Sequence, residues 1–274
     1  PNIGPYVDVP APDVNTNSEM MDALADEYSK VVGKNSPAVV TGKSIAAGGS
    51  SGREEATGLG GFFVLEQLVK ELKLRKPLTV AVQGFGNVGY HIALLLFKAG
   101  YKIVALSDSG GAIYDKAGLA VEKLKECKIK KGSLTRCCTN IISSEELISL
   151  PVDILIPAAL EGVITEDNAN LVKAKIILEM ANGPTTNQAD EILSDRGIIV
   201  VPDVLANAGG VTVSYYEWLQ NIKNQKWSKE KVEVKLKSAM TKAFERVWQI
   251  AKQKKVSLRL SAYILALERL SKSR

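Results

Sequence analysis

The residues with the clearest chemical meaning form a glycine-rich turn directly after the apolar stretch 78–82. A Gly-x-Gly-x-x-Gly turn between a strand and a helix is typical of dinucleotide binding. Its first glycine permits the tight turn, the second lets a pyrophosphate approach the backbone, and the third lets the helix pack on the strand. The N–H groups at the helix start attract the anion. We expect this turn to bind a dinucleotide, the alternative being a turn without a ligand; its residues are Gly84, Phe85, Gly86, Asn87, Val88 and Gly89.

A carboxylate lies where it could extend this site. Asp108 follows the glycines by roughly 20 residues, at the end of a second apolar stretch, 102–106. A carboxylate at that place accepts hydrogen bonds from a ribose and repels a 2′-phosphate. We therefore expect NAD as the cofactor, with NADP possible; the alternative is that Asp108 only begins the turn 107–111.

The remaining reactive side chains indicate little further chemistry. His91, the single histidine, lies at the phosphate end of the helix, so we expect a structural role and little room for a histidine-based hydrolase. The cysteines, Cys127, Cys137 and Cys138, form no paired framework and no metal-ligand cluster. We expect three idle thiols, no metal site and a reducing cytoplasm.

Composition and charge exclude several classes of protein. The 274 residues are 46% hydrophobic and 24% charged, which is ordinary for a globular protein. No apolar run approaches the roughly 18 to 20 residues that span a bilayer, and no signal peptide is visible. The net charge of +5 is concentrated in residues 223–255. Because glutamates interleave with these lysines and no aromatic platform accompanies them, we expect a solvated helix face rather than a nucleic-acid surface.

The elements that must position the turn alternate between strand and helix patterns. Short apolar runs between helices predict an α/β fold with a doubly wound, mostly parallel, Rossmann-like sheet, followed by a C-terminal helical segment. Residues 44–53 are rich in Gly and Ser and form a candidate hinge. Helices are expected from Asn17 or Ser18 to Val32 and over 55–72, 88–98, 231–254 and 258–271, and strands over 38–42, 78–82, 102–106, 153–156, 175–178 and 197–201.

Several segments together resemble, in order and spacing, the glutamate, leucine, phenylalanine and valine dehydrogenases. The resemblance is best to the glutamate branch, because the last segment ends in Val-Ser-Tyr-Tyr-Glu-Trp. The segments are Val9–Thr16, Thr41–Lys43, Gly48–Gly58, Gly84–Gly89, Ala181–Thr186 and Leu205–Trp218.

This resemblance implies oxidative deamination of L-glutamate to 2-oxoglutarate and ammonia with NAD(P)+. It implies that Asp13 transfers protons to and from the substrate nitrogen. Thr57 and Asn182 would hold the nicotinamide, with Asn207 nearby. It further implies a substrate site of Arg53, Val211 and Ser214, in which the Ser214 hydroxyl meets the γ-carboxylate.

The chain departs from the family pattern in two respects. The family carries a catalytic lysine in a glycine-rich segment upstream of the aspartate, and Lys30, Lys34 and Lys43 do not lie in such a context. Met180 stands where the family usually has a glycine. We therefore expect a piece of an enzyme that is inactive alone, the alternative being a non-catalytic NAD(H)-binding regulatory module.

The expected domains follow from the same comparison. Residues 1–42 would be a remnant of the substrate domain with a hinge, residues 43–218 the NAD-binding domain, and residues 219–274 helices that pack back toward the substrate domain. The resemblance also implies that the full-length form is a homo-oligomer, hexameric in this family, with small-molecule partners and no nucleic acid or membrane.

Overall fold

The computed structural model describes residues 2–13 and 15–272, which form two compact units. The first unit extends to Ala56 and also includes Gly209–Ala239; the second comprises Thr57–Ala208 and the chain from Met240 onward. The chain passes from one unit to the other at positions that differ from the predicted domain boundaries, which follow residues 42 and 218. The boundaries therefore remain a prediction about functional domains, while the segment Gly209–Ala239 packs with the first unit.

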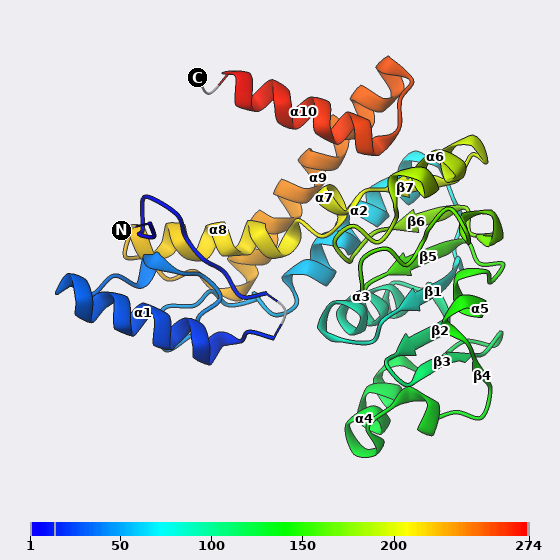
Figure 1. Cartoon of the computed structure of the whole chain (residues 1–274), viewed down its shortest axis with the longest axis horizontal. Helices are drawn as coiled ribbons and strands as arrows, with labels where there is room; N and C mark the ends of the chain where they lie inside the picture. Colours follow the sequence, from blue (N-terminus) through cyan, green and yellow to red (C-terminus); the bar gives the residue numbers. More distant parts are fainter. Residues whose placement is uncertain (1, 14, 273–274) are drawn as a thin grey trace. The chain divides into compact units, whose positions relative to one another are not determined.

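The second unit is built on a sheet, shown in Figure 1. Over the described residues this sheet has seven strands in the order β4-β3-β2-β1-β5-β6-β7. Neighbours from β2 through β1, β5 and β6 to β7 are parallel, whereas β3 pairs antiparallel with both β2 and β4. The predicted doubly wound, mostly parallel sheet is confirmed. The strands are β1 (Thr79–Gln83), β2 (Lys102–Asp108), β3 (Gly111–Tyr114), β4 (Ile141–Ile142), β5 (Ile154–Pro157), β6 (Ile176–Leu178) and β7 (Ile199–Val201).

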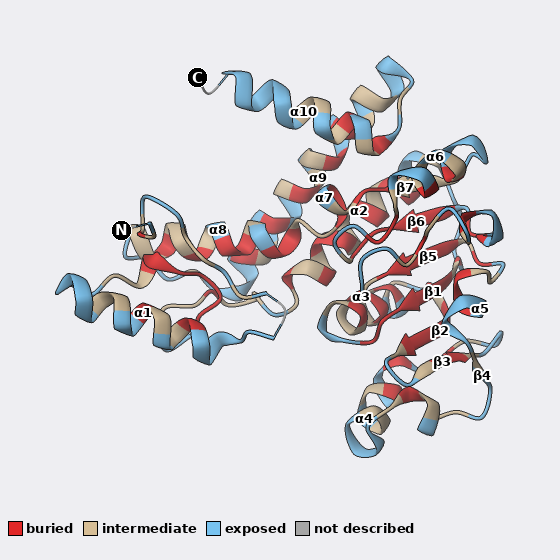
Figure 2. Cartoon of the chain, viewed as in Figure 1, coloured by how far each residue is buried: buried red, intermediate tan, exposed pale blue. Residues whose placement is uncertain are grey.

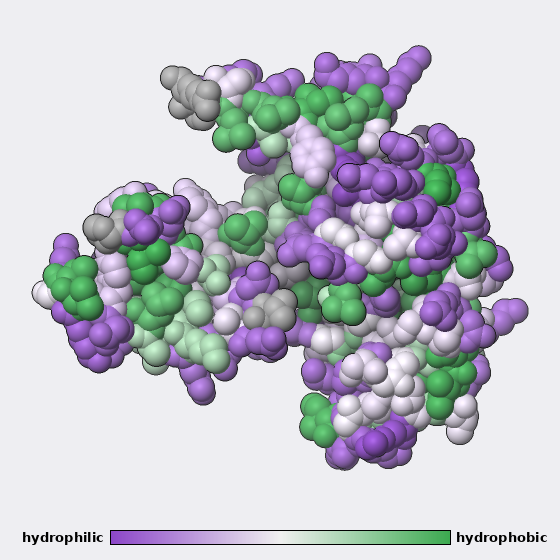
Figure 3. All heavy atoms as spheres, in the orientation of Figure 1, coloured by the Kyte–Doolittle hydropathy of each residue, from purple (hydrophilic) through white to green (hydrophobic). Residues whose placement is uncertain are grey.

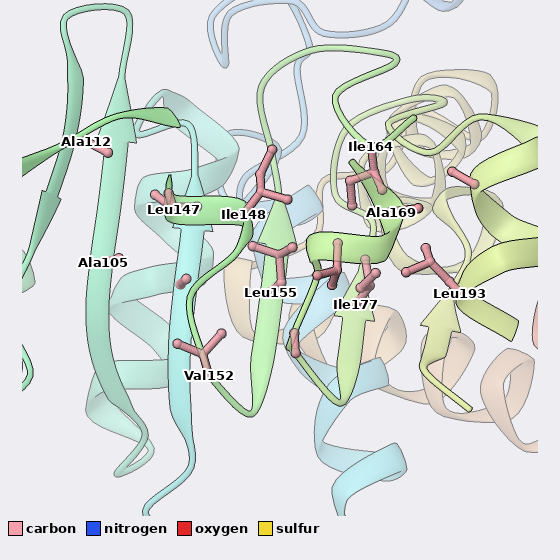
Figure 4. Packing of buried hydrophobic residues seen from close by; sticks show 14 of the residues in the cluster. Ala105, Ala112, Leu147, Ile148, Val152, Leu155, Ile164, Ala169, Ile177 and Leu193 are labelled. Atoms are coloured by element: carbon pink, nitrogen blue, oxygen red, sulfur yellow. The ribbon is translucent and has the colours of Figure 1, made fainter. Parts of the chain in front are cut away.

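Helices cover this sheet on both of its faces. One face packs its apolar side chains against α5, η3 and α6, as Figure 4 shows, while α3 contacts β1 and β2. Burial on both faces explains why the central strands β1, β2, β5 and β6 are rich in apolar residues and appear mostly red in Figure 2. The helices are α2 (Ala56–Glu71), α3 (Asn87–Lys98), α4 (Val121–Lys131), η2 (Leu134–Arg136), α5 (Ser144–Ile148), η3 (Ala169–Leu171), α6 (Asn187–Asp195), α7 (Asp203–Ala206) and α10 (Leu258–Lys272).

The C-terminal helices agree with the sequence patterns. The long α9 (Lys229–Lys254) begins in the first unit and ends in the second. It is followed by α10, whose side chains Leu260, Tyr263, Leu267 and Leu270 are about half to two-thirds exposed. Figure 3 shows green, hydrophobic atoms along the part of the molecule that α10 occupies in Figure 1. Within the described residues, no helix is both long enough and apolar enough to cross a membrane.

The first unit is smaller and consists of helices and turns. Its helices are α1 (Ser18–Val32), η1 (Pro37–Val39), α8 (Gly209–Ile222) and the first part of α9. As predicted, α1 begins after Asn17, whose side chain accepts a hydrogen bond from the Met20 N–H. Met21 and Ala25 of α1 pack against Val39 and Val40 in a small apolar core.

One prediction for the first unit is wrong. The expected strand over 38–42 is the 3-10 helix η1 with Pro37 at its start, and the N–H groups that follow it bond to the Pro10 carbonyl and the Glu217 carboxylate rather than to a strand. The hinge expected over the Gly/Ser-rich stretch 44–53 stays a prediction. Ser50 is buried within it, and its N–H donates to Glu217.

The cysteine prediction is also wrong. Cys127 on α4 and Cys137 after η2 form a disulfide, with their Cα atoms 6.0 Å apart. Only Cys138 matches the expectation of a free thiol. The chain reverses direction between α4 and η2, and this turn brings together two cysteines that are 10 positions apart in the sequence.

Candidate functional sites

The glycine turn has the geometry that dinucleotide binding requires. It lies at the end of β1, next to β5, where the strand order reverses direction. Gly84 has φ +95°, and a Cβ on Gly89 would overlap the Gly84 carbonyl, so helix α3 packs directly on the turn. The Ser107 hydroxyl at the end of β2 accepts a hydrogen bond of 2.9 Å from the Gly84 N–H and holds the turn in place.

The turn leaves room for a ligand at its middle glycine. Gly86 is exposed and is the N-cap of α3, and a Cβ built there meets no atom within 4 Å. No side chain of the described residues caps this helix start. Gln83, buried just before the turn, has a side-chain oxygen without a hydrogen-bond partner among the described residues. Open space and a helix start without a side-chain cap fit the phosphates of a dinucleotide, whereas the Gln83 oxygen, an acceptor, does not contribute to binding an anion.

Asp108 lies at the predicted place, but its carboxylate is enclosed. The side chain is 3% exposed and accepts hydrogen bonds from the N–H groups of Gly110 and Leu134 and from the Ser133 hydroxyl, with the Lys128 ammonium 3.2 Å away. Burial raises the pKa of Asp108, but these donors outweigh burial and hold it below its ordinary value. Asp108 therefore does begin a turn, and a ribose could reach its carboxylate only by displacing one of these donors.

The residues expected around the nicotinamide come from two loops that contact each other. The Asn207 amide donates to the Asn182 side-chain oxygen at 2.6 Å. Thr57 lies in the first turn of α2, one turn before Gly61. A Cβ on Gly61 would overlap the Met180 side chain and come within 3.3 Å of the Ala206 carbonyl. The structure thus brings Asn182 and Asn207 together, and Thr57 shares the helix face that meets both loops.

Met180, which departs from the family pattern, has a defined place in the structure. Its side chain is buried, only 3% exposed, and packs against α2 where Gly61 lacks a side chain. The glycine on α2 therefore provides the space that this methionine needs.

A charge cluster that the sequence did not indicate holds these two loops. The Arg259 guanidinium on α10 bonds Glu179 at 2.8 Å and Asp190 at 3.1 and 3.2 Å, and it lies 3.5 Å from Asp203. Glu179 is fully buried at the end of β6, and burial raises its pKa although Arg259 opposes this. The sequence signal that could have indicated Glu179 is an acidic residue directly after an apolar strand, which is the signal that identified Asp108.

In the first unit, the residues expected at the substrate site are partly brought together. The Arg53 Nε donates a hydrogen bond of 3.0 Å to the Ser214 hydroxyl. Burial lowers the pKa of Arg53, and the negative charge of Glu217 opposes this. Ser214 and the exposed Val211 line a cavity of about 510 Å³. Its remaining lining residues are mostly apolar and include Tyr6, Val9, Tyr215 and Trp218.

Asp13 lies in an exposed turn at the edge of this unit. Its N–H donates to the Thr16 hydroxyl, which donates back to the Asp13 carbonyl. The preceding Pro12 packs so closely on Gly42 that a Cβ there would overlap its ring. The loop position of Asp13 agrees with the prediction, and Val14 beside it is outside the described residues.

Lys43 has a structural partner. Its ammonium bonds Glu217 at 2.7 Å, and both side chains are fully buried. Glu217 also accepts hydrogen bonds from the N–H groups of Gly42, Lys43 and Ser50, so one carboxylate fixes the whole loop onto α8. Lys43 is therefore not available to bind a substrate, which agrees with its unusual context in the sequence.

Comparisons with known proteins place this geometry in a family. The profile of the Glutamate/Leucine/Phenylalanine/Valine dehydrogenases matches residues 48–274. The chain is 45% identical to the cryptic catabolic NAD-specific glutamate dehydrogenase of Bacillus subtilis (strain 168), over 99% of this chain and 64% of that protein. It is 48% identical to an NADP-specific glutamate dehydrogenase of Synechocystis sp., over 99% of this chain and 66% of that protein.

The solved structures agree with the sequence relatives. The hetero-hexameric glutamate dehydrogenase of Thermus thermophilus superposes with a TM-score of 0.94 at 36% identity, over 100% of this chain and 65% of that one. The chain thus spans about two-thirds of the length of the proteins that it matches. The resemblance first visible in its motifs is confirmed: the chain belongs to the Glutamate/Leucine/Phenylalanine/Valine dehydrogenase family.

Proposed function

We propose that the protein containing this chain catalyses the oxidative deamination of L-glutamate to 2-oxoglutarate and ammonia with NAD+ or NADP+. The observation that carries the proposal is the bond between Arg53 and Ser214 beside the cavity. Because the Ser214 oxygen accepts this bond, its O–H can donate to a carboxylate next to a guanidinium. That donor pair favours glutamate over an apolar amino acid, since an apolar analogue would leave it unsatisfied.

The cofactor residues belong to the second unit. The turn Gly84–Gly89 and the start of α3 bind the pyrophosphate, with Phe85, Asn87 and Val88 shaping the turn. Thr57, Asn182 and Asn207 orient the nicotinamide, and the pair of asparagines is already hydrogen-bonded. The cofactor, when bound, supplies the hydride acceptor.

The substrate residues belong to the first unit. Arg53 and Ser214 bind the side-chain carboxylate, and Val211 packs on the aliphatic part of the substrate. Asp13 accepts a proton from the substrate amino group and returns protons to the leaving nitrogen. Its exposed position lets it exchange these protons with water.

NAD remains our proposed preference over NADP. Asp108 places a negative charge at the end of β2, where a 2′-phosphate would add two more, although Lys128 compensates part of this charge. Fluorescence titration of the chain with NADH and with NADPH measures the preference. Equal or tighter binding of NADPH contradicts it.

We also propose that the polypeptide 1–274 alone binds NADH but has negligible glutamate dehydrogenase activity. The resemblance calls for a catalytic lysine, and two of the lysines that follow the Asp13 segment pair with other side chains: Lys43 with Glu217 and Lys30 with Asp26. Correct positioning of reactants is worth about 7–11 kcal/mol of barrier. A chain that lacks the groups that grip and activate the substrate therefore loses most of the rate.

The test compares two purified proteins in the presence of L-glutamate and NAD+, with NADH formation followed by absorbance. One is the polypeptide 1–274, and the other is a form extended upstream through a glycine-rich lysine segment. We expect turnover only from the extended form. Robust turnover by 1–274 contradicts the proposed inactivity, and NADH binding without turnover by either form supports the regulatory module instead.

The assembly and location of the full protein are proposals as well. The Thermus thermophilus relative is described as hetero-hexameric, and we propose that the full-length form of this protein is a homo-oligomer in the cytoplasm. Sedimentation equilibrium of the full-length protein measures the assembly, and a monomer contradicts it.

A further inference from the structure

We propose that Arg259 is a positioning residue for the nicotinamide half of the cofactor, acting through Glu179 and Asp203. The inference rests on the proposed binding of a dinucleotide by the second unit. It adds a role for α10, which carries none of the residues that the family resemblance identified.

The guanidinium of Arg259 joins three acidic side chains from separate parts of the second unit. It reaches Glu179 at the end of β6, Asp190 on α6 and Asp203 at the start of α7. The Arg259 side chain is 15% exposed and the Glu179 side chain is fully buried. A planar guanidinium can donate in several directions at fixed angles, so it sets the positions of these carboxylates relative to one another.

Both carboxylates on which the proposal depends hold the nicotinamide loops directly. Glu179 immediately precedes Met180–Gly183, and its second oxygen accepts a 2.9 Å bond from the Asp203 N–H. Asp203 in turn accepts a 2.8 Å bond from the Gly183 N–H. The loop that carries Asn182 is therefore fixed at both of its ends by side chains that Arg259 contacts.

The second loop closes the same network. Asp203 is the first residue of α7, and Asn207 is the C-cap of this one-turn helix. Asn207 donates to Asn182, so a displacement of Asp203 moves both asparagines. Contacts and chain segments together form a closed ring. Arg259 bonds Glu179, the chain 179–182 leads to Asn182, Asn207 donates to Asn182, and the chain 203–207 leads back to Asp203 beside Arg259.

The balance of charge makes Arg259 the critical member of this ring. It is the cation that contacts all three carboxylates, so its loss leaves like charges close together, with Glu179 and Asp203 held only by their bonds from backbone N–H groups. Glu179 is fully enclosed and cannot turn to solvent. We expect the carboxylates to separate and the two loops to move with them.

The pyrophosphate turn lies outside this ring. Gly84 is held by Ser107 on β2, and a Cβ there would meet Ala158 and Ala159 after β5 rather than any ring member. Loss of Arg259 should therefore weaken contacts to the nicotinamide but not to the adenosine diphosphate part. This difference separates positioning from a general loss of structure.

The experiment measures binding of NADH and of ADP-ribose, which lacks the nicotinamide, by isothermal titration calorimetry. The variants are Arg259→Met and Arg259→Lys, and Arg269→Met is the matched control, since Arg269 is exposed on the same helix. We expect Arg259→Met to weaken NADH binding about tenfold or more, which corresponds to about 1.4 kcal/mol, with ADP-ribose within about twofold of the unaltered chain. Arg259→Lys keeps the charge without the planar donors, so its NADH affinity should lie between those of Arg259→Met and the unaltered chain. The control Arg269→Met should bind NADH as the unaltered chain does.

If far-ultraviolet circular dichroism shows that Arg259→Met does not fold, the double variant Arg259→Met/Glu179→Gln removes the unpaired buried charge and is titrated with the same two ligands. Equal loss of NADH and ADP-ribose affinity in the folded variants overturns the inference, as does undiminished NADH affinity. An unaltered chain that binds neither ligand refutes the proposed function itself, and the inference with it.

Discussion

Two clusters of charged side chains, one in each unit of the molecule, hold loops in place, and they differ in their balance of charge. In the first unit, Lys43 and Glu217 match one cation with one carboxylate, and both side chains are fully buried. In the second unit, Arg259 faces three carboxylates and keeps 15% of its side chain exposed. Both clusters attach a loop with expected site residues to a helix.

The difference in balance indicates a difference in role. Glu217 accepts from three N–H groups as well as from Lys43, so its position is determined by the backbone of one loop. Glu179 and Asp203 also accept from backbone N–H groups, but the three carboxylates around Arg259 would repel each other without it. Their positions relative to one another therefore depend mainly on a single side chain. We infer that the first cluster is purely structural, whereas the second can move when its charge changes.

The largest effect is expected where a balanced buried pair is broken. Glu217→Ala leaves the Lys43 ammonium buried without its carboxylate and should destabilise the first unit by about 3–5 kcal/mol. Hydrogen exchange of peptides from α8, followed by mass spectrometry, measures this separately from the second unit. The double variant Lys43→Met/Glu217→Gln should regain much of the loss, and a Glu217→Ala variant with unchanged exchange would disprove the structural role.

A tight contact in the second unit should give the next largest effect. Gly61→Val places a side chain against Met180 and the Ala206 carbonyl, and such overpacking costs about 1–3 kcal/mol. Urea unfolding of the variant measures the cost. Adding Met180→Ala should restore part of the stability, and no rescue would mean that the methionine does not fill the space beside Gly61.

A more exposed carboxylate provides a pH-dependent comparison. Burial raises the pKa of Asp153, but bonds from Thr79 and Lys175 outweigh it and hold the pKa below its ordinary value. Its stabilisation is therefore present above the unfolded pKa of about 3.9 and is lost as the pH falls through the lowered folded pKa. Asp153→Asn should cost about 1 kcal/mol near neutral pH.

The measurement is urea unfolding at about pH 7 and at about pH 3. The variant and the unaltered chain should differ at neutral pH and converge in acid. A difference that stays constant across this range would show that the Asp153 charge does not contribute.

The smallest effect is expected from removing one of the excess carboxylates. Asp190→Asn loses part of its bonding to Arg259 but also reduces the repulsion with Glu179, so we expect a change in stability within about 0.5 kcal/mol. Hydrogen exchange of peptides from α6 is the readout. A loss as large as that from Glu217→Ala would show that the two clusters do not differ in the way that we infer.

The sequence predicted the fold of the second unit well because buried parallel strands are short and apolar. It predicted the start of α1 from Asn17, and α3, β1 and β2 to within about two residues. The antiparallel strands β3 and β4 were missed, since four and two residues give too little periodicity to detect. The prediction of a strand over 38–42 failed because the apolar residues of this segment pack in a helical turn against α1 and α8.

Site residues were predictable where a local motif marks them. The glycine turn was identified from its spacing and from its place between an apolar strand and a helix, and the resemblance supplied Asn182 and Asn207, which the structure finds in contact. The Cys127–Cys137 disulfide and the partners of Asp108 and Glu179 depend on how distant segments meet. Such long-range partners leave no trace in the local pattern of a single sequence.

The central claim is that the Gly84–Gly89 turn binds the pyrophosphate of NAD(H), and one titration tests it directly. The unaltered chain and Gly86→Val are titrated with NADH by fluorescence, with far-ultraviolet circular dichroism to confirm folding. Gly86 has open space around its Cβ position, so valine should fold normally and yet occupy the volume of the pyrophosphate. We predict that the unaltered chain binds NADH and that Gly86→Val loses at least about tenfold in affinity; undiminished affinity in a folded Gly86→Val variant would contradict the account.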